Sequence, residues 1–212
     1  MNLTIFGGTG TAGLLTIKEA ISKGYKVTAY ARNPEKITFK DKNLHVVVGE
    51  LTEYEKIEKV IRGSDAVISL LGPKAKAKET KIANGYDNII KAMVSSGKKR
   101  LITAVSSSYS DEQDRFNFMV RFGILLLKIM GASILKDIIK TGDLIRNSPL
   151  DWTMARLPML KNSPGKGNLY AGYVGDGKFN FFELTREDLA EFLVEQIEDR
   201  RFIKKAPAIS NL

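Results

Sequence analysis

The chain has 212 residues, of which 43% are hydrophobic and 27% charged, proportions typical of an ordinary globular protein rather than of a disordered or fibrous one. It contains no cysteine and one histidine, which excludes disulfides, thiolate chemistry and a histidine-based metal cluster, so we expect no metal. The 33 Lys and Arg against 24 Asp and Glu give a net charge of +9, which favours anionic ligands such as nucleotide phosphates.

The first residues follow an apolar strand pattern at once and show no basic segment, apolar run and cleavage site of a signal peptide. The longest apolar stretch, residues 116–130, is interrupted by Arg121 and Lys128 and is shorter than the roughly 20 apolar residues that a membrane-spanning helix needs. We therefore expect a cytoplasmic protein with no membrane partner.

Apolar strand patterns and amphipathic helix patterns alternate along the first half of the chain. Continuous apolar runs such as 46–48 and 66–68 are typical of parallel strands that are covered on both faces. The alternation predicts an α/β fold with a doubly wound, parallel sheet of the Rossmann type. The expected strands are 2–6, 25–30, 44–48, 65–71 and 100–105, and the expected helices are 11–23, 54–62 and 79–96.

The second half of the chain is less regular. The predicted elements there are a polar turn at 110–114, helices at 116–130 and 132–147, a strand at 151–157, and glycine-rich loops at 162–167 and 172–178. Thr185 and Asp188 form a capping-box pattern that starts a final helix, with Asp in place of the usual Glu. We expect one domain over 1–212, with segments of about 110–147 and 159–182 on the substrate side.

The turn after the first strand carries the most informative motif. Glycines without a Cβ permit a tight strand-to-helix turn, and they let a diphosphate approach the free N–H groups of the helix N-terminus. A tight turn without a ligand would use the same glycines. Here, however, the motif follows an apolar strand and opens a βαβ unit of about 30 residues, as in dinucleotide-binding folds. The predicted diphosphate-binding residues are Gly7, Gly8, Thr9, Gly10, Thr11, Ala12 and Gly13.

The end of the second predicted strand indicates which dinucleotide is bound. NAD-binding folds place an acidic residue about 20 positions after the glycines, where it accepts from the ribose 2′-hydroxyl. Here Arg32 lies at that position, and no Asp or Glu occurs between Glu19 and Glu35. A guanidinium can bind a 2′-phosphate, which a carboxylate would repel. We therefore predict NADP(H), although Arg32 on a merely exposed loop is the alternative.

The sequence resembles the atypical short-chain dehydrogenase/reductases, in particular the branch that contains flavin and biliverdin-IXβ reductases and related NAD(P)H-binding proteins. Two of the matching stretches, GGTGTAG and LDWTMARLP, are specific to this class, and the others contribute by their order and spacing. The stretches are GGTGTAG at 7–13, ARNP at 31–34, GELT at 49–52, SDAVISLLG at 64–72, residues 84–93, AVSSS at 104–108, LDWTMARLP at 150–158 and TREDLAEFL at 185–193.

The resemblance implies further cofactor contacts. Glu50 and Leu51 match the loop that meets the adenine, where the family more often has Asp than Glu. Leu70, Leu71 and Gly72 match the backbone edge beside the riboses. On the nicotinamide side, the resemblance implies Ser106 and Ser107 at the end of the fifth strand, and Leu157 and Pro158 in the turn after the sixth.

The Tyr and Lys four residues apart that typical short-chain dehydrogenases use as a proton donor are absent. Tyr109 is followed four residues later by Gln113, and Tyr86 by Ile90. The flavin and biliverdin branch resembles this chain in lacking the pair, because a solvent proton can complete hydride transfer to a planar conjugated acceptor. Our candidates for polarising the acceptor are Ser107 and then Tyr109, although the serines could equally be turn residues.

Three functions are consistent with these patterns. The first is an NADPH-dependent reductase of a small planar acceptor such as a flavin or quinone, and the second is a non-catalytic NADP(H)-binding redox sensor. The third is a nucleic-acid-associated protein that uses lysine-rich segments at 74–81 and 98–100. Nucleic acid is the least favoured partner, because the lysines are not interleaved with aromatic residues. The sequence is compatible with a monomer or a homodimer.

Overall fold

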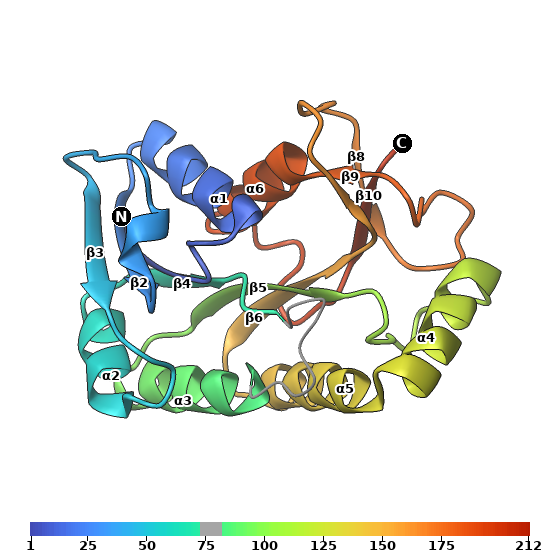
Figure 1. The fold of residues 1–212 in the computed structure, drawn as a ribbon, viewed down its shortest axis with the longest axis horizontal. Helices are drawn as coiled ribbons and strands as arrows, with labels where there is room; N and C mark the ends of the chain where they lie inside the picture. The colour runs from blue at the N-terminus through green and yellow to red at the C-terminus, as the bar shows by residue number, and fades with distance from the viewer. Residues whose placement is uncertain (73–81) are drawn as a thin grey trace.

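The computed structural model describes residues 1–72 and 82–212. Within these ranges, eight strands form one sheet in the order β3-β2-β1-β4-β5-β6-β10-β8 (Figure 1). All neighbours pair in parallel except β8, which runs antiparallel to β10 at the edge. The strands are β1 (Asn2–Phe6), β2 (Lys26–Ala31), β3 (Leu44–Val48), β4 (Ala66–Ser69), β5 (Arg100–Ser106), β6 (Asp151–Leu157), β8 (Leu169–Gly172) and β10 (Ala208–Asn211).

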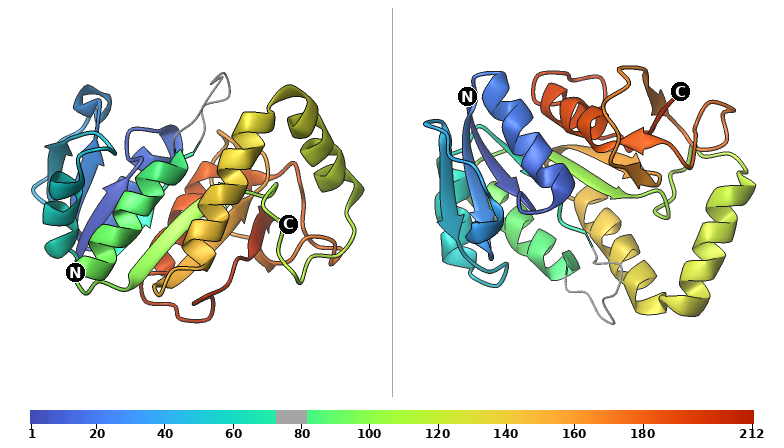
Figure 2. Two further views of the ribbon diagram at one scale, coloured as in Figure 1. Left: turned by 90° about the horizontal axis from the view of Figure 1, so that it is seen from below. Right: turned by 45° about the horizontal axis from the view of Figure 1, so that its top comes forward.

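Helices cover both faces of this sheet, as Figures 1 and 2 show. One face carries α1 (Thr11–Ser22) and α6 (Arg186–Glu195), and the other carries α2 (Tyr54–Arg62), α3 (Ile82–Ser95) and α5 (Ala132–Arg146). Helix α4 (Phe118–Met130) contacts α5 and stands at the end of that second layer. The remaining elements are the short 3₁₀ helix η1 (Pro34–Lys36) and a small parallel pair, β7 (Leu160–Lys161) with β9 (Leu184–Thr185).

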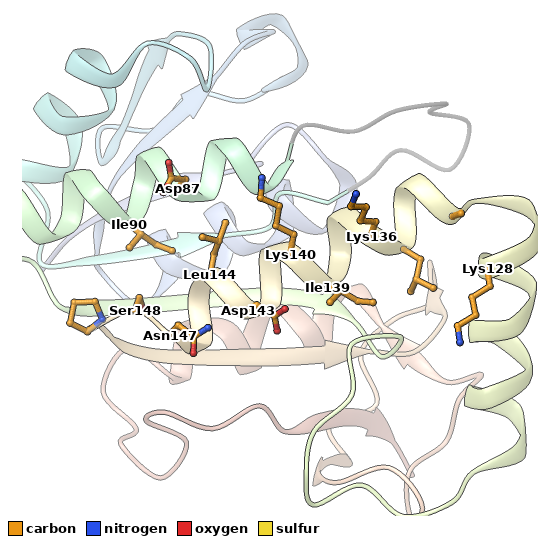
Figure 3. Close-up of a pocket in the computed structure, with 13 residues that line it drawn as sticks. Asp87, Ile90, Lys128, Lys136, Ile139, Lys140, Asp143, Leu144, Asn147 and Ser148 are labelled. Carbon is orange, nitrogen blue, oxygen red and sulfur yellow. The ribbon is translucent and has the colours of Figure 1, made fainter.

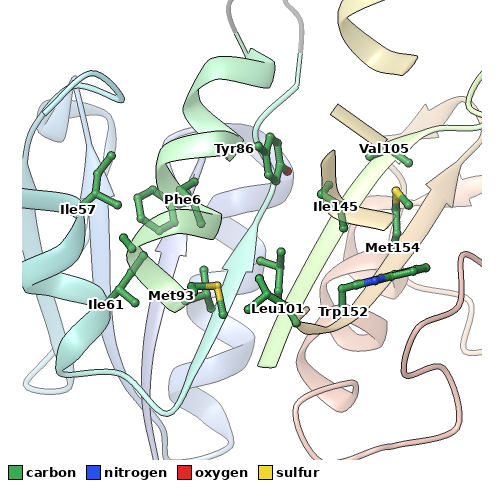
Figure 4. Close-up of a cluster of buried hydrophobic side chains, with 14 of the residues drawn as sticks. Phe6, Ile57, Ile61, Tyr86, Met93, Leu101, Val105, Ile145, Trp152 and Met154 are labelled. Carbon is green, nitrogen blue, oxygen red and sulfur yellow. The ribbon is translucent and has the colours of Figure 1, made fainter. Parts of the chain in front are cut away.

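The inner strands β1, β4, β5 and β6 are buried on both faces, which confirms the doubly wound prediction. Strand β3 lies at the edge of the sheet, and Val48 is 54% exposed, so the expectation that run 46–48 is covered on both faces is wrong. Side chains alternate along a strand, and in β1 Leu3 and Ile5 join the cluster under α1 and α6, while Phe6 joins the cluster under α2, α3 and α5. Figure 4 shows this second cluster, where Tyr86 and Trp152 accompany Phe6. Residue pairs in β1 and its neighbours keep one register, so the carboxyl ends of β1, β2 and β4 meet at one edge.

Two strands at the edge of the sheet, β8 and β10, were not predicted from the sequence. Side-chain hydrogen bonds as well as backbone pairing hold strand β10 in place. Asn211 Oδ1 accepts from the Thr185 amide at 2.8 Å, and Asn211 Nδ2 donates to Asp188 Oδ2 at 2.7 Å. The predicted helix start is confirmed, since Thr185 Oγ1 accepts from the Asp188 amide at 3.0 Å. The reciprocal contact of a capping box is made by Asn211 instead of Asp188.

Helix α4 differs from a core helix. It begins at Phe118 because the Asn117 side chain accepts from the Val120 amide at 3.1 Å. Val120 is buried beside Val174. Most of the other apolar side chains are exposed, Phe118 by 66% and Ile129 by 73%. The apolar segment at 116–130 therefore packs into the protein along one side of the helix and is largely exposed elsewhere.

Candidate cofactor site

The glycine turn between β1 and α1 is closed to side chains. Gly7 has a φ of +77°, a conformation that favours glycine, and a Cβ there would lie 2.8 Å from the Leu70 carbonyl carbon. A Cβ on Gly13 would overlap the Gly7 carbonyl oxygen and stand 2.7 Å from Gly8 Cα. The first turn of α1 therefore packs directly on the backbone of the loop.

The N-terminus of α1 presents unpaired backbone amides beside this turn. Gly10 is the N-cap residue, no side chain in the described ranges caps the helix, and its first turn carries no acidic residue. The turn itself is tightened by a hydrogen bond of 3.2 Å from the Gly10 amide to the Gly7 carbonyl. Free N–H groups at the positive end of a helix dipole suit an anionic diphosphate. The backbone fits the group that the motif predicts.

The structure brings Arg32 and Glu50 together at the ends of β2 and β3. Arg32 Nη1 lies 4.0 Å from Glu50 Oε2, both side chains are more than half exposed, and Arg32 Nε donates to Asn33 Oδ1 at 3.3 Å. The backbone behind Glu50 is fixed, because the Tyr30 hydroxyl donates to the Glu50 carbonyl at 2.9 Å. Burial, then the charges of Glu53 and Glu50, raise the pKa of Tyr30 to about 12, so this donor is retained at neutral pH.

Leu51 follows Glu50 in the same loop and is also anchored. Its carbonyl accepts from Asn88 Nδ2 at 2.7 Å, and its side chain lies against Gly85, where a Cβ would stand 2.7 Å from Leu51 Cδ1. Helix α3 thereby fixes the loop that follows β3. The side chain of Glu50 is more than half exposed, with Arg32 as its ion-pair neighbour.

A cleft of about 340 Å³ continues from the glycine turn across the carboxyl ends of β4, β5 and β6, the edge at which open α/β sheets bind their ligands. Seven of the predicted cofactor residues line it: Ala12, Leu70, Leu71, Gly72, Ser106, Leu157 and Pro158. The other lining residues are Ile82, Ala104, Val105, Asp137, Ile138, Thr141, Leu160 and Leu189. Most of the wall is therefore apolar.

The two predicted catalytic residues, Ser107 and Tyr109, are not among the lining residues. Ser107 is buried, and its amide donates to the Leu157 carbonyl at 2.9 Å, which joins the ends of β5 and β6. The Tyr109 hydroxyl donates to Asp143 Oδ1 at 3.1 Å and accepts from Arg146 Nε at 3.0 Å. Burial raises the pKa of Tyr109 despite the opposing effect of Arg146.

Ser106 is the member of the serine run that reaches the cleft. Its hydroxyl donates to Ser108 Oγ at 3.1 Å and accepts from the Ser108 amide at 3.2 Å. These bonds are those of a turn residue. The alternative interpretation of the serines as turn residues therefore describes part of their role.

An ion pair that the sequence did not reveal joins β6 to the turn at 111–114. Arg156 of β6 is fully buried and reaches both carboxylate oxygens of Asp114, at 2.5 and 2.7 Å, while its Nε donates to the Ala206 carbonyl at 2.7 Å. Asp114 also accepts from the Val174 amide at 3.0 Å. Burial disfavours the charged carboxylate, but the hydrogen bonds from Arg156 hold the pKa of Asp114 below its usual value. The pair ties the predicted substrate-side segments to the sheet.

A larger hollow, of about 790 Å³, lies on the outer face of α5 (Figure 3). Its wall includes Lys136, Ile139, Lys140 and Leu144 of α5 and Lys128 of α4. None of its lining residues within the described ranges belongs to the glycine turn or to a strand end. The smaller cleft is thus the hollow of the two that the predicted cofactor residues line.

Three further features bear on the sequence predictions. In the described residues, no three His, Asp or Glu side chains gather in a way that could hold a metal ion. No single helix there has the length and hydropathy to cross a membrane; α4 and α5 together, bent by 119°, meet that criterion. Of the two lysine-rich segments, the one at 74–81 lies outside the described residues. In the other, at 98–100, Arg100 donates within the protein, to the Asp151 carbonyl at 2.8 Å and to the Gln196 carbonyl.

Residues 7–200 match the family described as NAD(P)H-binding. The chain belongs to this family. The cofactor prediction is thereby confirmed at the level of NAD(P)H, and so is the resemblance to NAD(P)H-binding proteins.

Curated relatives are more distant in sequence. An isoflavone reductase homologue from Nicotiana tabacum is 25% identical over 214 residues, which cover 96% of this chain and 66% of the relative. A photosystem II assembly factor from Trieres chinensis is 39% identical over 69 residues, 32% of this chain and 22% of the relative. The chain thus spans at most about two thirds of the length of either protein.

Solved structures share the fold over nearly their whole length. The oxidoreductase ylbE from Lactococcus lactis superposes with a TM-score of 0.82 at 21% identity, covering 100% of this chain and 91% of that one. A short-chain dehydrogenase/reductase from Veillonella parvula, solved with NADP, gives 0.78 at 18% identity over 99% and 94%. ChuY from Escherichia coli, described as an anaerobillin reductase, gives a TM-score of 0.77 at 15% identity, covering 100% of this chain and 97% of that one.

Proposed function

We propose that the protein is an NADPH-dependent reductase that delivers hydride to a planar conjugated acceptor such as a flavin or a quinone. One observation carries the proposal. The cleft beside the glycine turn is mostly apolar, and none of its lining residues in the described ranges is Tyr, Lys or His. An acceptor whose reduced form is completed by a solvent proton needs no such acid, whereas reduction of an ordinary ketone does.

The chain would bind the cofactor along the carboxyl edge of the sheet. The amides of the glycine turn would hold the diphosphate, and the backbone of Leu70, Leu71 and Gly72 would lie beside the riboses. Apolar residues such as Leu157 and Leu160 would exclude water from the face where the acceptor stacks. The bound cofactor supplies the hydride.

The hydroxyls near the end of β5 take different roles in this proposal. Of the two serines expected beside the nicotinamide, Ser106 lines the cleft and keeps that role, whereas Ser107 does not line it. Ser107 and Tyr109 act as positioning residues, because Ser107 joins β5 to β6 and Tyr109 holds α5 through Asp143.

The preference for NADPH over NADH rests on Arg32. Its guanidinium is more than half exposed and has one carboxylate, that of Glu50, at the limit of ion-pair distance. A 2′-phosphate at the end of β2 would give it a closer anionic partner. Glu50 remains the candidate for the adenine amino group.

Fluorescence titration with NADPH and NADH, followed by steady-state assays with FMN, riboflavin and a small quinone, tests the proposal. We expect tighter binding of NADPH and loss of the reduced-nicotinamide absorbance with at least one acceptor. Tight binding with no turnover of any acceptor would instead favour a redox sensor. The relatives named as reductases support the class of reaction by likeness alone.

A further inference from the structure

Thr141 is a polar residue of the cleft whose hydroxyl makes no hydrogen bond within the described structure. It lies on α5, lines the cleft and is 4% exposed, and its Oγ1 has no hydrogen-bond partner among the described residues. A buried hydroxyl without a partner is unfavourable, and proteins keep few of them. Such an atom in the wall of a binding cleft points to a ligand.

A threonine within a helix ordinarily bonds to its own helix, and the chain offers a direct comparison. Thr16 of α1 does so, because its Oγ1 donates to the Ala12 carbonyl at 2.9 Å. Thr141 Oγ1 makes no such bond. The donor and acceptor capacity of its hydroxyl is therefore unused in the described structure, at a residue that lines the cleft.

The backbone around Thr141 is held in place on both sides. One turn earlier, the Asp137 carboxylate accepts from the amides of Ile82 and Ala83 at the start of α3, at 3.1 and 3.3 Å. The next residue, Gly142, has no side chain, and a Cβ there would overlap the Tyr109 ring. This packing fixes the distance between Thr141 and the end of β5, as binding residues require.

The other hydroxyl in the wall, that of Ser106, is engaged with Ser108. Thr141 shares the cleft with Leu70, Leu71 and Gly72, the backbone edge that we place beside the riboses. A ribose carries two hydroxyls that need polar partners in an otherwise apolar wall. We propose that Thr141 Oγ1 hydrogen-bonds a hydroxyl of the nicotinamide ribose. This inference rests on the proposed cofactor placement and is independent of the acceptor.

Isothermal titration with NADP⁺ and with adenosine 2′,5′-bisphosphate, which lacks the nicotinamide riboside, tests the proposal. For Thr141→Val, we expect binding of NADP⁺ to weaken about ten-fold, the effect of one hydrogen bond, and binding of the bisphosphate to stay unchanged. Thr141→Ser keeps the hydroxyl, so its affinity for NADP⁺ should stay near that of the wild type. The thermal midpoint of Thr141→Val without ligand should equal or exceed that of the wild type.

Several results would overturn the inference. An unchanged affinity of Thr141→Val for NADP⁺ would show that the hydroxyl does not meet the cofactor. An equal loss for both ligands would show a disturbed site, and a lowered thermal midpoint would show that the hydroxyl has a structural bond. If the wild type bound neither ligand, the cofactor placement itself would fail, and with it the proposed function.

Discussion

Replacing Asp114 by Asn tests how much the buried ion pair with Arg156 contributes to stability. Asp114 accepts from both guanidinium Nη atoms of Arg156, from the Val174 amide and from the Asp111 amide at 2.8 Å. Asn has one acceptor oxygen, and its amide group would face a guanidinium that is 0% exposed. The substitution therefore leaves a buried charge without its counterion.

The expected loss of stability follows from that burial. Breaking one side of a buried ion pair costs about 3–5 kcal/mol, and the 15% exposure of the Asp114 side chain places the loss near the lower end. A loss of about 3 kcal/mol corresponds to a fall of roughly 6–12 °C in Tm for a domain of this size. Thermal unfolding followed by circular dichroism at neutral pH measures it.

The same experiment across pH checks the electrostatic origin. Burial opposes ionisation of Asp114, yet the hydrogen bonds from Arg156 lower its folded pKa below the unfolded value. A lowered pKa contributes stability that is present above the unfolded pKa of about 3.9 and is lost as the pH falls through the folded pKa. The difference in Tm between wild type and Asp114→Asn should therefore shrink below about pH 4.

Asp87→Asn is the matched control. Asp87 pairs with Lys91 at 2.7 Å on the surface of α3, and the two side chains are 41% and 62% exposed. Such pairs contribute about 0–1 kcal/mol, so Tm should change by no more than roughly 2–4 °C. If Asp114→Asn lowered Tm no more than this control, the reasoning about the buried pair would be refuted.

Three further substitutions test the site. Arg32→Glu should weaken NADPH binding about 10–100-fold, through loss of a charge-assisted hydrogen bond, and leave NADH binding as tight or tighter; titration with both cofactors measures this, and an unmoved preference would contradict the role of Arg32. Gly13→Ala should weaken NADPH binding at least about ten-fold, because the new Cβ overlaps the Gly7 carbonyl. The control is Gly63→Ala, whose Cβ would lie an ordinary 3.7 Å from the Val60 carbonyl oxygen. It should bind NADPH as the wild type does. Tyr109→Phe should lower the free energy of unfolding by about 1 kcal/mol and keep most of kcat; a loss of kcat with unchanged stability would make Tyr109 catalytic.

The central sheet could be predicted because its signal is local. The first six strands follow one another as largely apolar runs with helix patterns between most of them, and burial of the inner strands on both faces requires such runs. Strands β8 and β10 carry no such pattern. In β10 the buried side chain of Asn211 has its hydrogen bonds satisfied by Thr185 and Asp188. These residues are distant in the sequence, so hydrophobic periodicity does not predict the contact.

The same distinction applies to the site. The glycine turn and Arg32 could be read from spacing, since the positions that touch a diphosphate or a 2′-phosphate are fixed relative to one strand. Ser107 and Tyr109 were selected by residue type, but packing turns Tyr109 toward Asp143 and away from the cleft. Thr141 lies inside a helix with no motif, and its importance depends on the absence of a partner in the described structure.

A single-turnover experiment tests the central claim most directly. The complex of the protein with NADPH is mixed anaerobically with FMN, and in parallel with a quinone, while the absorbances of the acceptor and of reduced nicotinamide are followed together. The account predicts that one acceptor is reduced at the rate at which NADPH is oxidised, and that Gly13→Ala lowers both signals together at the same subsaturating NADPH concentration. Saturable NADPH binding with no reduction of either acceptor would contradict it.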